Sequence, residues 1–112
     1  MKLRATLTLL ALLGAGSVAV TGHAADKEFT TTLKDLHFTP DTLEVPAGER
    51  FKVLVKNEGT SSEEFESTDL KKEKVIPPGK TGSFVIGPLK AGEYKFFGDF
   101  HPDTAQGKLI AK

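Results

Sequence analysis

The fold is decided by residues 50–57, which read Arg-Phe-Lys-Val-Leu-Val-Lys-Asn. Phe51, Val53 and Val55 are two residues apart, so in a β-strand their side chains point to the same face. Polar residues fill most of the other positions, and Leu54 is the exception to the alternation. Such alternation is typical of a strand with one face in a core and the other in solvent.

Short strand patterns continue on both sides of this stretch. They cover residues 29–34, 42–45, 62–67, 83–86, 94–97 and 108–111, and turn residues such as Pro46-Ala47-Gly48 and Pro77-Pro78-Gly79 separate them. No helical periodicity of useful length follows Ala25. About seven or eight short strands spaced by turns predict an all-β sandwich or barrel.

The apolar positions of these segments supply the candidate core. It consists of Phe29, Leu33, Phe38, Leu43, Val45, Phe51, Val53, Val55, Phe65, Val75, Phe84, Ile86, Tyr94, Phe96 and Leu109. The chain has eight phenylalanines and no tryptophan, so phenylalanine rings supply most of the aromatic packing. Lys71, Lys72 and Lys74 are interpreted as a solvated loop, or as a docking site for an acidic partner.

The N-terminal segment has the order of a secretory signal peptide. A basic head, Met1-Lys2-Leu3-Arg4, precedes a mostly apolar run from Leu9 to Val20, and Gly22 and Ala24 are small residues where a signal peptidase reads them. The apolar run is shorter than the roughly 20 residues that span a bilayer, which argues against an anchor. We expect residues 1–24 to be a signal peptide and residues 25–112 to be one periplasmic domain.

Charge and cysteine content exclude several classes of function. Loss of Lys2 and Arg4 reduces the 15 basic residues to 13, against 15 acidic residues. A nucleic-acid-binding domain would instead show a clear basic excess. The chain lacks cysteine, which excludes disulfides, thiol redox motifs, c-type haem attachment, cysteine-ligated zinc and cysteine nucleophiles.

The first segment with candidate chemistry is acidic and lies in the strand pattern of residues 62–67. Glu64 and Glu66 share one face of that strand, while Phe65 points the other way into the core. Neighbouring carboxylates repel each other unless a cation lies between them. The pair is therefore a candidate metal site, and the alternative is an ordinary solvated strand face.

The second segment, residues 98–103, reads Gly-Asp-Phe-His-Pro-Asp and follows an aromatic strand. If this segment is extended, Asp99 and His101 point the same way and form half of a metal site. The alternative is a loop with a capping aspartate and a hydrogen-bonded histidine. His37, beside the candidate core residue Phe38, is interpreted as structural or exposed.

Two parts of the chain resemble the opening and the close of a cupredoxin domain. The first runs from Phe38 to Gly48 (Phe-Thr-Pro-Asp-Thr-Leu-Glu-Val-Pro-Ala-Gly) and continues through residues 51–57. The second combines residues 92–97, a loop with His101-Pro102, and residues 107–110. The resemblance covers nearly all of residues 25–112. It implies a Greek-key sandwich with a metal site at one end, between two loops.

The same resemblance shows where a blue-copper site would lie. Such a site uses two histidines and one cysteine, usually with a weak axial methionine. Gly98 stands where the cysteine would be and Glu63 where the first histidine would be, and only His101 remains. The methionine is replaced by one of three residues, Thr104, Ala105 or Gln106. These departures argue against blue-copper electron transfer.

The segments Glu64-Phe65-Glu66 and Asp99-Phe100-His101 look like those of the cupredoxin-like subfamily associated with bacterial periplasmic iron uptake. This resemblance implies a small periplasmic component that works with a periplasmic iron-binding protein and an inner-membrane permease. The candidate metal ligands are Glu64, Glu66, Asp99 and His101, with Glu63 as a further candidate.

Carboxylate oxygens with one imidazole suit iron or manganese, and copper(II) less selectively. We therefore expect an iron or copper ion whose oxidation or delivery the protein assists, with ferroxidase-type accessory activity as the one enzymatic hypothesis. Two alternatives stay open. One is a metal-free module that docks a periplasmic partner, and the other is copper storage or resistance, for which this chain has few methionines and histidines.

Overall fold

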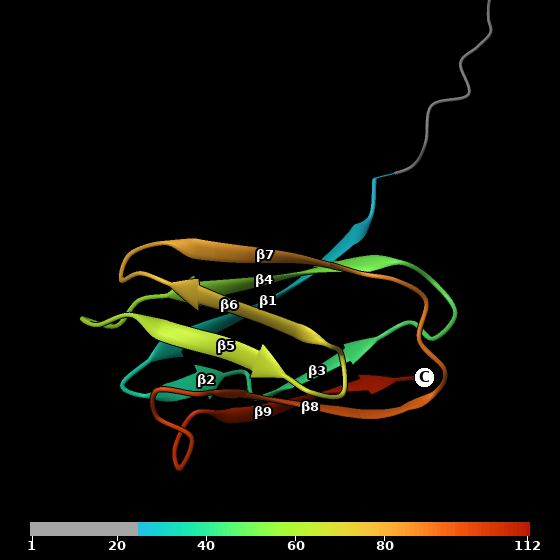
Figure 1. Cartoon of the computed structure of the whole chain (residues 1–112). Helices are drawn as coiled ribbons and strands as arrows, with labels where there is room; N and C mark the ends of the chain where they lie inside the picture. Colours follow the sequence, from blue (N-terminus) through green and yellow to red (C-terminus); the bar gives the residue numbers. More distant parts are fainter. Residues whose placement is uncertain (1–24) are drawn as a thin grey trace, which may run out of the picture.

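The computed structural model describes residues 25–112, and these residues form nine strands and no helix. In chain order the strands are β1 (Lys27–Lys34), β2 (His37–Thr39), β3 (Thr42–Val45), β4 (Phe51–Asn57), β5 (Glu63–Ser67), β6 (Lys72–Ile76), β7 (Thr81–Ile86), β8 (Gly92–Gly98) and β9 (Gln106–Ala111). They form two sheets that pack as a sandwich (Figure 1). The predicted all-β sandwich is confirmed, with nine strands instead of seven or eight.

The predicted signal peptide, residues 1–24, lies outside the described residues. Within residues 25–112 the structure contains no helix that is long and apolar enough to cross a membrane.

The first sheet has the strand order β2-β1-β4-β7 and contains the stretch that decides the fold. Its strand β4 pairs in parallel with β1 and antiparallel with β7, so it is hydrogen-bonded on both sides. Phe51, Val53 and Val55 are buried on the face that meets the other sheet. The alternation is clear in β4 because one face of this central strand is in the core.

The second sheet has the order β3-β9-β8-β5-β6 and contains both segments with candidate chemistry. Strands β5 and β8 are antiparallel and pair Phe65 with Gly98 and Glu66 with Phe97. The acidic strand therefore runs beside the end of β8. This pairing brings the turn between β8 and β9 next to β5.

Phenylalanine rings join the two sheets. Phe65 of the second sheet lies 4.6 Å, centroid to centroid, from Phe84 of the first. Phe96 packs at 5.1 Å from both Phe65 and Phe38, the latter contact being edge to face. Aromatic pairs at these separations add to the hydrophobic stabilisation that burial provides. The core thus lies directly beneath the strands that carry the candidate site.

Most of the predicted core is buried, and one prediction was wrong. Phe29 and Tyr94 are only partly buried and pack against the core. Val75 is 49% exposed, because it lies opposite Glu64 on the outer face of the sheet, whereas Ile76 points inward. The core also includes four residues that were not predicted: Leu70, Ile76, Ala105 and Ala111.

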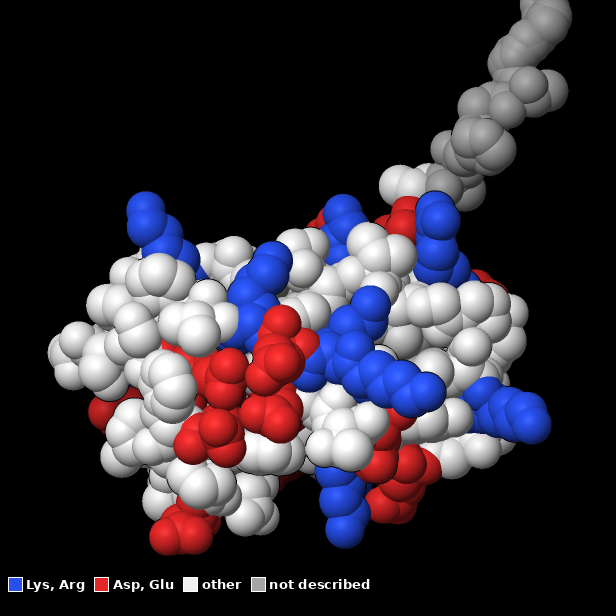
Figure 2. Space-filling view, in the orientation of Figure 1, with Lys and Arg blue, Asp and Glu red and all other residues white. Residues whose placement is uncertain are grey.

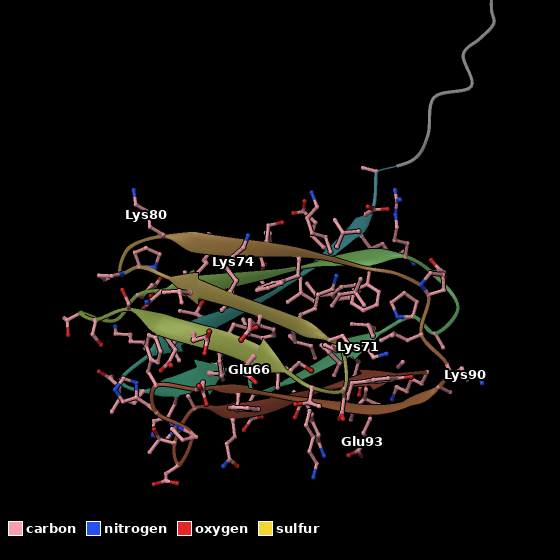
Figure 3. All side chains as sticks on the ribbon, viewed as in Figure 1. Glu66, Lys71, Lys74, Lys80, Lys90 and Glu93 are labelled. Atoms are coloured by element: carbon pink, nitrogen blue, oxygen red, sulfur yellow. The ribbon has the colours of Figure 1, made fainter. Side chains whose placement is uncertain are left out.

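The prediction of a loop at Lys71, Lys72 and Lys74 was also wrong for Lys72 and Lys74. These two residues belong to β6 (Lys72–Ile76), which is an edge strand of the second sheet. Three of its five residues are charged, which makes it resemble a solvated loop in the sequence. Lys74 extends from β6 (Figure 3). Its Nζ lies 5.6 Å from the centre of the Phe84 ring. Charged residues on an edge strand discourage pairing with another chain.

Candidate metal centre

Strand β5 divides the predicted ligands between its two faces. Glu64 and Glu66 are partly exposed on the outer face, and Glu63, Phe65 and Ser67 are buried on the inner face. The division follows from the two-residue period of a strand. The prediction that Glu64 and Glu66 share a face, with Phe65 in the core, is confirmed.

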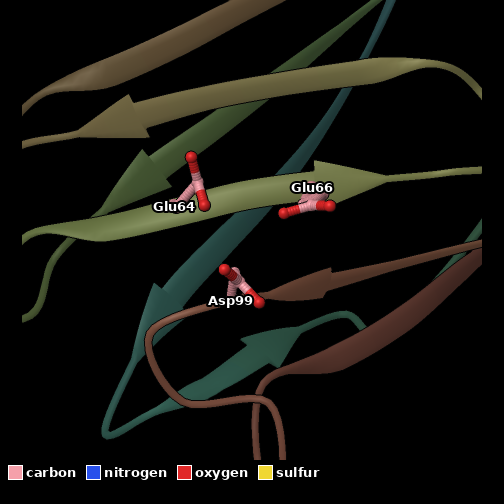
Figure 4. A group of neighbouring side chains, drawn as sticks. All are labelled: Glu64, Glu66 and Asp99. Carbon is pink, nitrogen blue, oxygen red and sulfur yellow. The ribbon is translucent and has the colours of Figure 1, made fainter.

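Asp99 joins Glu64 and Glu66 on the outer face. Its backbone N–H donates a hydrogen bond to the carbonyl oxygen of Glu64 at 2.8 Å, which continues the pairing of β5 with β8 by one step. One carboxylate oxygen from each of the three residues lies within 4.8 Å of the other two (Figure 4). We call this group the acidic triad. Among the described residues it is the one group of three or more metal-ligating side chains at such separations.

Glu73 adds a fourth negative charge beside the triad, because β6 pairs it directly with Glu66. Acidic side chains gather over β5 and β6, with lysines beside them (Figure 2). Yet none of the ion pairs in residues 25–112 includes Glu64, Glu66, Glu73 or Asp99. Within the part of the chain that the structure describes, no lysine, arginine or histidine is therefore ion-paired with the triad.

This environment raises the pKa of two members of the triad. Desolvation has the largest effect on the pKa of Glu64, followed by the charge of Glu73, a hydrogen bond with Asp99 and the charges of Glu66 and Asp99. Desolvation is also the first cause of the raised pKa of Glu66, followed by the charges of Asp99 and Glu73. Carboxylates under such repulsion gain from a cation placed between them.

Glu63 and His101 form a separate pair on the inner side of β5. Oε2 of Glu63 lies 2.6 Å from Nδ1 of His101. Oε1 of Glu63 accepts hydrogen bonds from the backbone N–H groups of Phe100 at 2.7 Å and Glu64 at 3.1 Å. The Glu63 side chain is 3% exposed and that of His101 is 32% exposed.

The five predicted ligands thus belong to two groups, and Asp99 and His101 do not point the same way. The segment is not extended, because the N–H of His101 donates to the carbonyl of Gly98 and the N–H of Ala105 donates to that of His101. This turn directs Asp99 outward and His101 toward Glu63. His37 is exposed, as one of its two interpretations expected. Glu73, which lies beside the triad, was not among the predicted ligands. Its place in the segment before Ile76 could bring it near the acidic strand, but the sequence does not show that β6 pairs with β5.

A blue-copper centre does not fit these residues. Such a centre needs a thiolate and two imidazoles, and the chain has no cysteine. The glycine at the expected cysteine position has no room for a side chain. A Cβ on Gly98 would lie 2.6 Å from Cδ of Glu63 and 2.8 Å from Cβ of Ala105.

Comparison with known proteins agrees with this architecture. An uncharacterized protein of Rickettsia prowazekii (strain Madrid E) is 43% identical over 83 residues, which are 74% of this chain and 66% of that protein. The chain therefore spans about two thirds of the length of this relative.

Several solved structures have the same fold at low sequence identity. Auracyanin B superposes with a TM-score of 0.68 at 12% identity, over 83% of this chain and 94% of that one. A reduced mutant of amicyanin gives 0.64 at 17% identity, over 80% and 86% of the two chains. The Cu-containing nitrite reductase of Thermus scotoductus SA-01 gives 0.62 at 14%, over 79% of this chain and 28% of that one. The profile of the family described as "Cupredoxin-like domain" matches residues 4–111, and this chain belongs to that family.

Proposed function

We propose that this protein is a periplasmic metal carrier that binds iron at the acidic triad and delivers it to an inner-membrane permease. The observation that carries the proposal is the approach of three carboxylate oxygens to within 4.8 Å of one another, with no cationic side chain of residues 25–112 ion-paired to them. The resemblance of Glu64-Phe65-Glu66 and Asp99-Phe100-His101 to the iron-uptake subfamily supports the choice of metal.

The ligand chemistry supports a hard metal ion. Glu64, Glu66 and Asp99 offer only oxygen atoms, which suit hard cations better than the soft ligands of a blue-copper site do. Three anionic ligands also gain more from Fe(III) than from Fe(II), because the attraction grows with the charge of the ion. Copper(II) is the competing ion, since carboxylates bind it with little selectivity.

The position of the triad suits a carrier. It lies on the outer face of an open sheet, so an ion can arrive and leave without any rearrangement of the core. A cation between the carboxylates also favours their ionised forms, and so opposes the desolvation and the repulsion that together raise the pKa values of Glu64 and Glu66. Since only the folded chain brings the three carboxylates together, a bound ion stabilises the folded state.

Docking of a protein partner is a second candidate function, and a different observation favours it. Among residues 25–112, two of the four large exposed apolar side chains are next to the triad. Val75 lies opposite Glu64, and Phe100 follows Asp99 and is 50% exposed. An acidic patch beside apolar side chains fits a partner with a basic surface.

Calorimetric titration of the metal-free protein tests the proposal. Fe(II) is titrated under anaerobic conditions, and Fe(III) as a weak chelate and Cu(II) are titrated separately. The variant Glu66→Gln/Asp99→Asn removes two of the three anionic ligands. Its matched control, Glu44→Gln/Glu93→Gln, removes two charges that pair with Lys112 and Lys108 and leaves the triad intact.

We expect saturable iron binding that weakens at least about tenfold in the triad variant and is unchanged in the control. Copper binding that exceeds iron binding and depends on the same residues would replace iron by copper as the cargo. Equal binding by both variants, or no heat and no change in melting temperature, would contradict the proposal and favour the docking function.

A further inference from the structure

The buried carboxylate of Glu63 is surrounded by hydrogen-bond donors. Two backbone N–H groups, those of Phe100 and Glu64, donate to its Oε1. Among residues 25–112, its Oε2 has one hydrogen-bond partner, the Nδ1 atom of His101 at 2.6 Å. An ionised carboxylate only accepts hydrogen bonds, so a proton on Nδ1 completes this set of donors.

Small residues make the space that Glu63 fills. Gly98 lies opposite Phe65 in the pairing of β5 with β8, and Ala105 lies at the far end of the turn. Both are buried, and Ala105 is completely so. A side chain at position 98 would need the same volume as the carboxyl group of Glu63. Residues 63 and 98 therefore compete for one space.

We infer that Glu63 is a positioning residue that replaces a metal ion at this end of the sandwich. Its carboxylate connects β5 to the turn between β8 and β9, and it holds His101 in the tautomer with the proton on Nδ1. Nε2 of His101 is then the nitrogen with the free lone pair. This assignment concerns the inner side of β5, so its tests are independent of metal binding at the acidic triad.

The tautomer determines which ring nitrogen of His101 can accept a hydrogen bond from a neighbouring group. His101 and Glu63 line a cavity of about 620 Å³ together with residues 33–36 and 57–61. Because Nδ1 faces Glu63, the Nε2 edge of the ring is the polar edge left for a ligand in this cavity. A carboxylate that accepts the other ring N–H also makes a histidine a stronger ligand. Nε2 is therefore a ready acceptor for a hydrogen-bond donor that enters the cavity.

Long-range proton–nitrogen NMR correlation spectra of the protein test the tautomer directly. They distinguish a ring nitrogen that carries a proton from one with a free lone pair, at a pH well above the ordinary pKa of imidazole. We expect His101 to carry its proton on Nδ1, in contrast to exposed His37, which serves as the internal control. In Glu63→Gln, we expect His101 to lose this preference. A proton on Nε2 of His101 in the unsubstituted protein would overturn the inference without any variant.

The competition for space is tested by substitution of glycine. Gly98→Ala should lower Tm by roughly 5–15 °C, because Glu63 or the backbone must move. Gly87→Ala is the matched control, since a Cβ there meets no atom within 4 Å. In a Glu63→Ala background, Gly98→Ala should cost clearly less than in the unsubstituted protein. Additive effects of the two substitutions, or a Gly98→Ala variant as stable as the control, would overturn the inference.

Discussion

Glu66 of β5 lies directly opposite Glu73 of the edge strand β6, so two acidic residues form a cross-strand pair. Like charges in this arrangement destabilise a sheet. Neither side chain belongs to an ion pair within residues 25–112, although β6 also contains Lys72 and Lys74. The repulsion is therefore present in the metal-free protein and can be removed by substitution.

Glu73→Lys should stabilise the metal-free protein and weaken its metal binding. The new ammonium group faces Glu66 and replaces a repulsive pair by an attractive one, which we expect to raise Tm by about 1–5 °C. The same positive charge opposes a metal ion at the triad. Thermal unfolding and calorimetric titration measure the two effects. Glu93→Lys is the control, because Glu93 lies at the start of β8 and Asp99 of the triad follows its end. This substitution loses the ion pair with Lys108, so we expect no gain in Tm.

The contribution of Glu64 and Glu66 to the stability of the metal-free protein should fall as pH rises from the ordinary glutamate pKa through their raised folded pKa values. The folded pKa values of Glu64 and Glu66 are raised above 4.5, so the folded state retains their protons over a range in which the unfolded state has lost them. Stability decreases with pH over that range, and the penalty is complete above the folded pKa values.

Urea unfolding at several pH values measures this dependence. Glu64→Gln/Glu66→Gln lacks both ionisable groups. The advantage in its free energy of unfolding over the unsubstituted protein should be small near the ordinary glutamate pKa and larger at neutral pH. Glu44→Gln/Glu93→Gln should not show this growing advantage. An advantage that is the same at all pH values would contradict the assigned cause.

Phe65→Ala should be among the most destabilising single substitutions. The ring is 2% exposed and contacts Phe84 of the other sheet and Phe96 of its own sheet, so its removal leaves a cavity. We expect a loss of about 3–5 kcal/mol in the free energy of unfolding, measured by urea denaturation. Val85→Ala, at a position that is 47% exposed, should change it by less than about 0.5 kcal/mol. Similar losses for the two variants would contradict the packing described.

The sequence predicts the features that depend on strand period alone. Burial of Phe51, Val53 and Val55 and the common face of Glu64 and Glu66 follow from side chains two residues apart. The order of short strands also indicates the sandwich. No contact between distant residues is needed for any of these predictions.

The features that the sequence did not predict depend on how the strands pair and on the turn between β8 and β9. Val75 was assigned to the core because the register of β6 with β5, which turns it outward, is absent from the local pattern. Asp99 and His101 separate because residues 98–105 form a turn held by hydrogen bonds among its own backbone groups. Glu63 could be noticed as a replacement for histidine, but its burial beneath a glycine appears only once β5 and β8 are paired.

Building a copper–thiolate centre into this protein should require substitutions at both competing positions. Gly98→Cys alone introduces a thiol into the space of the Glu63 carboxyl group, so we expect a destabilised protein without a copper–thiolate absorption band. Glu63→His/Gly98→Cys removes the carboxylate and supplies, with His101, two imidazoles and one thiolate, which is the donor set of such a centre. Visible absorption after addition of Cu(II) measures the outcome, with Glu63→His as the control that lacks a thiol. A band in Gly98→Cys as strong as in the double variant would mean that Glu63 does not close the site.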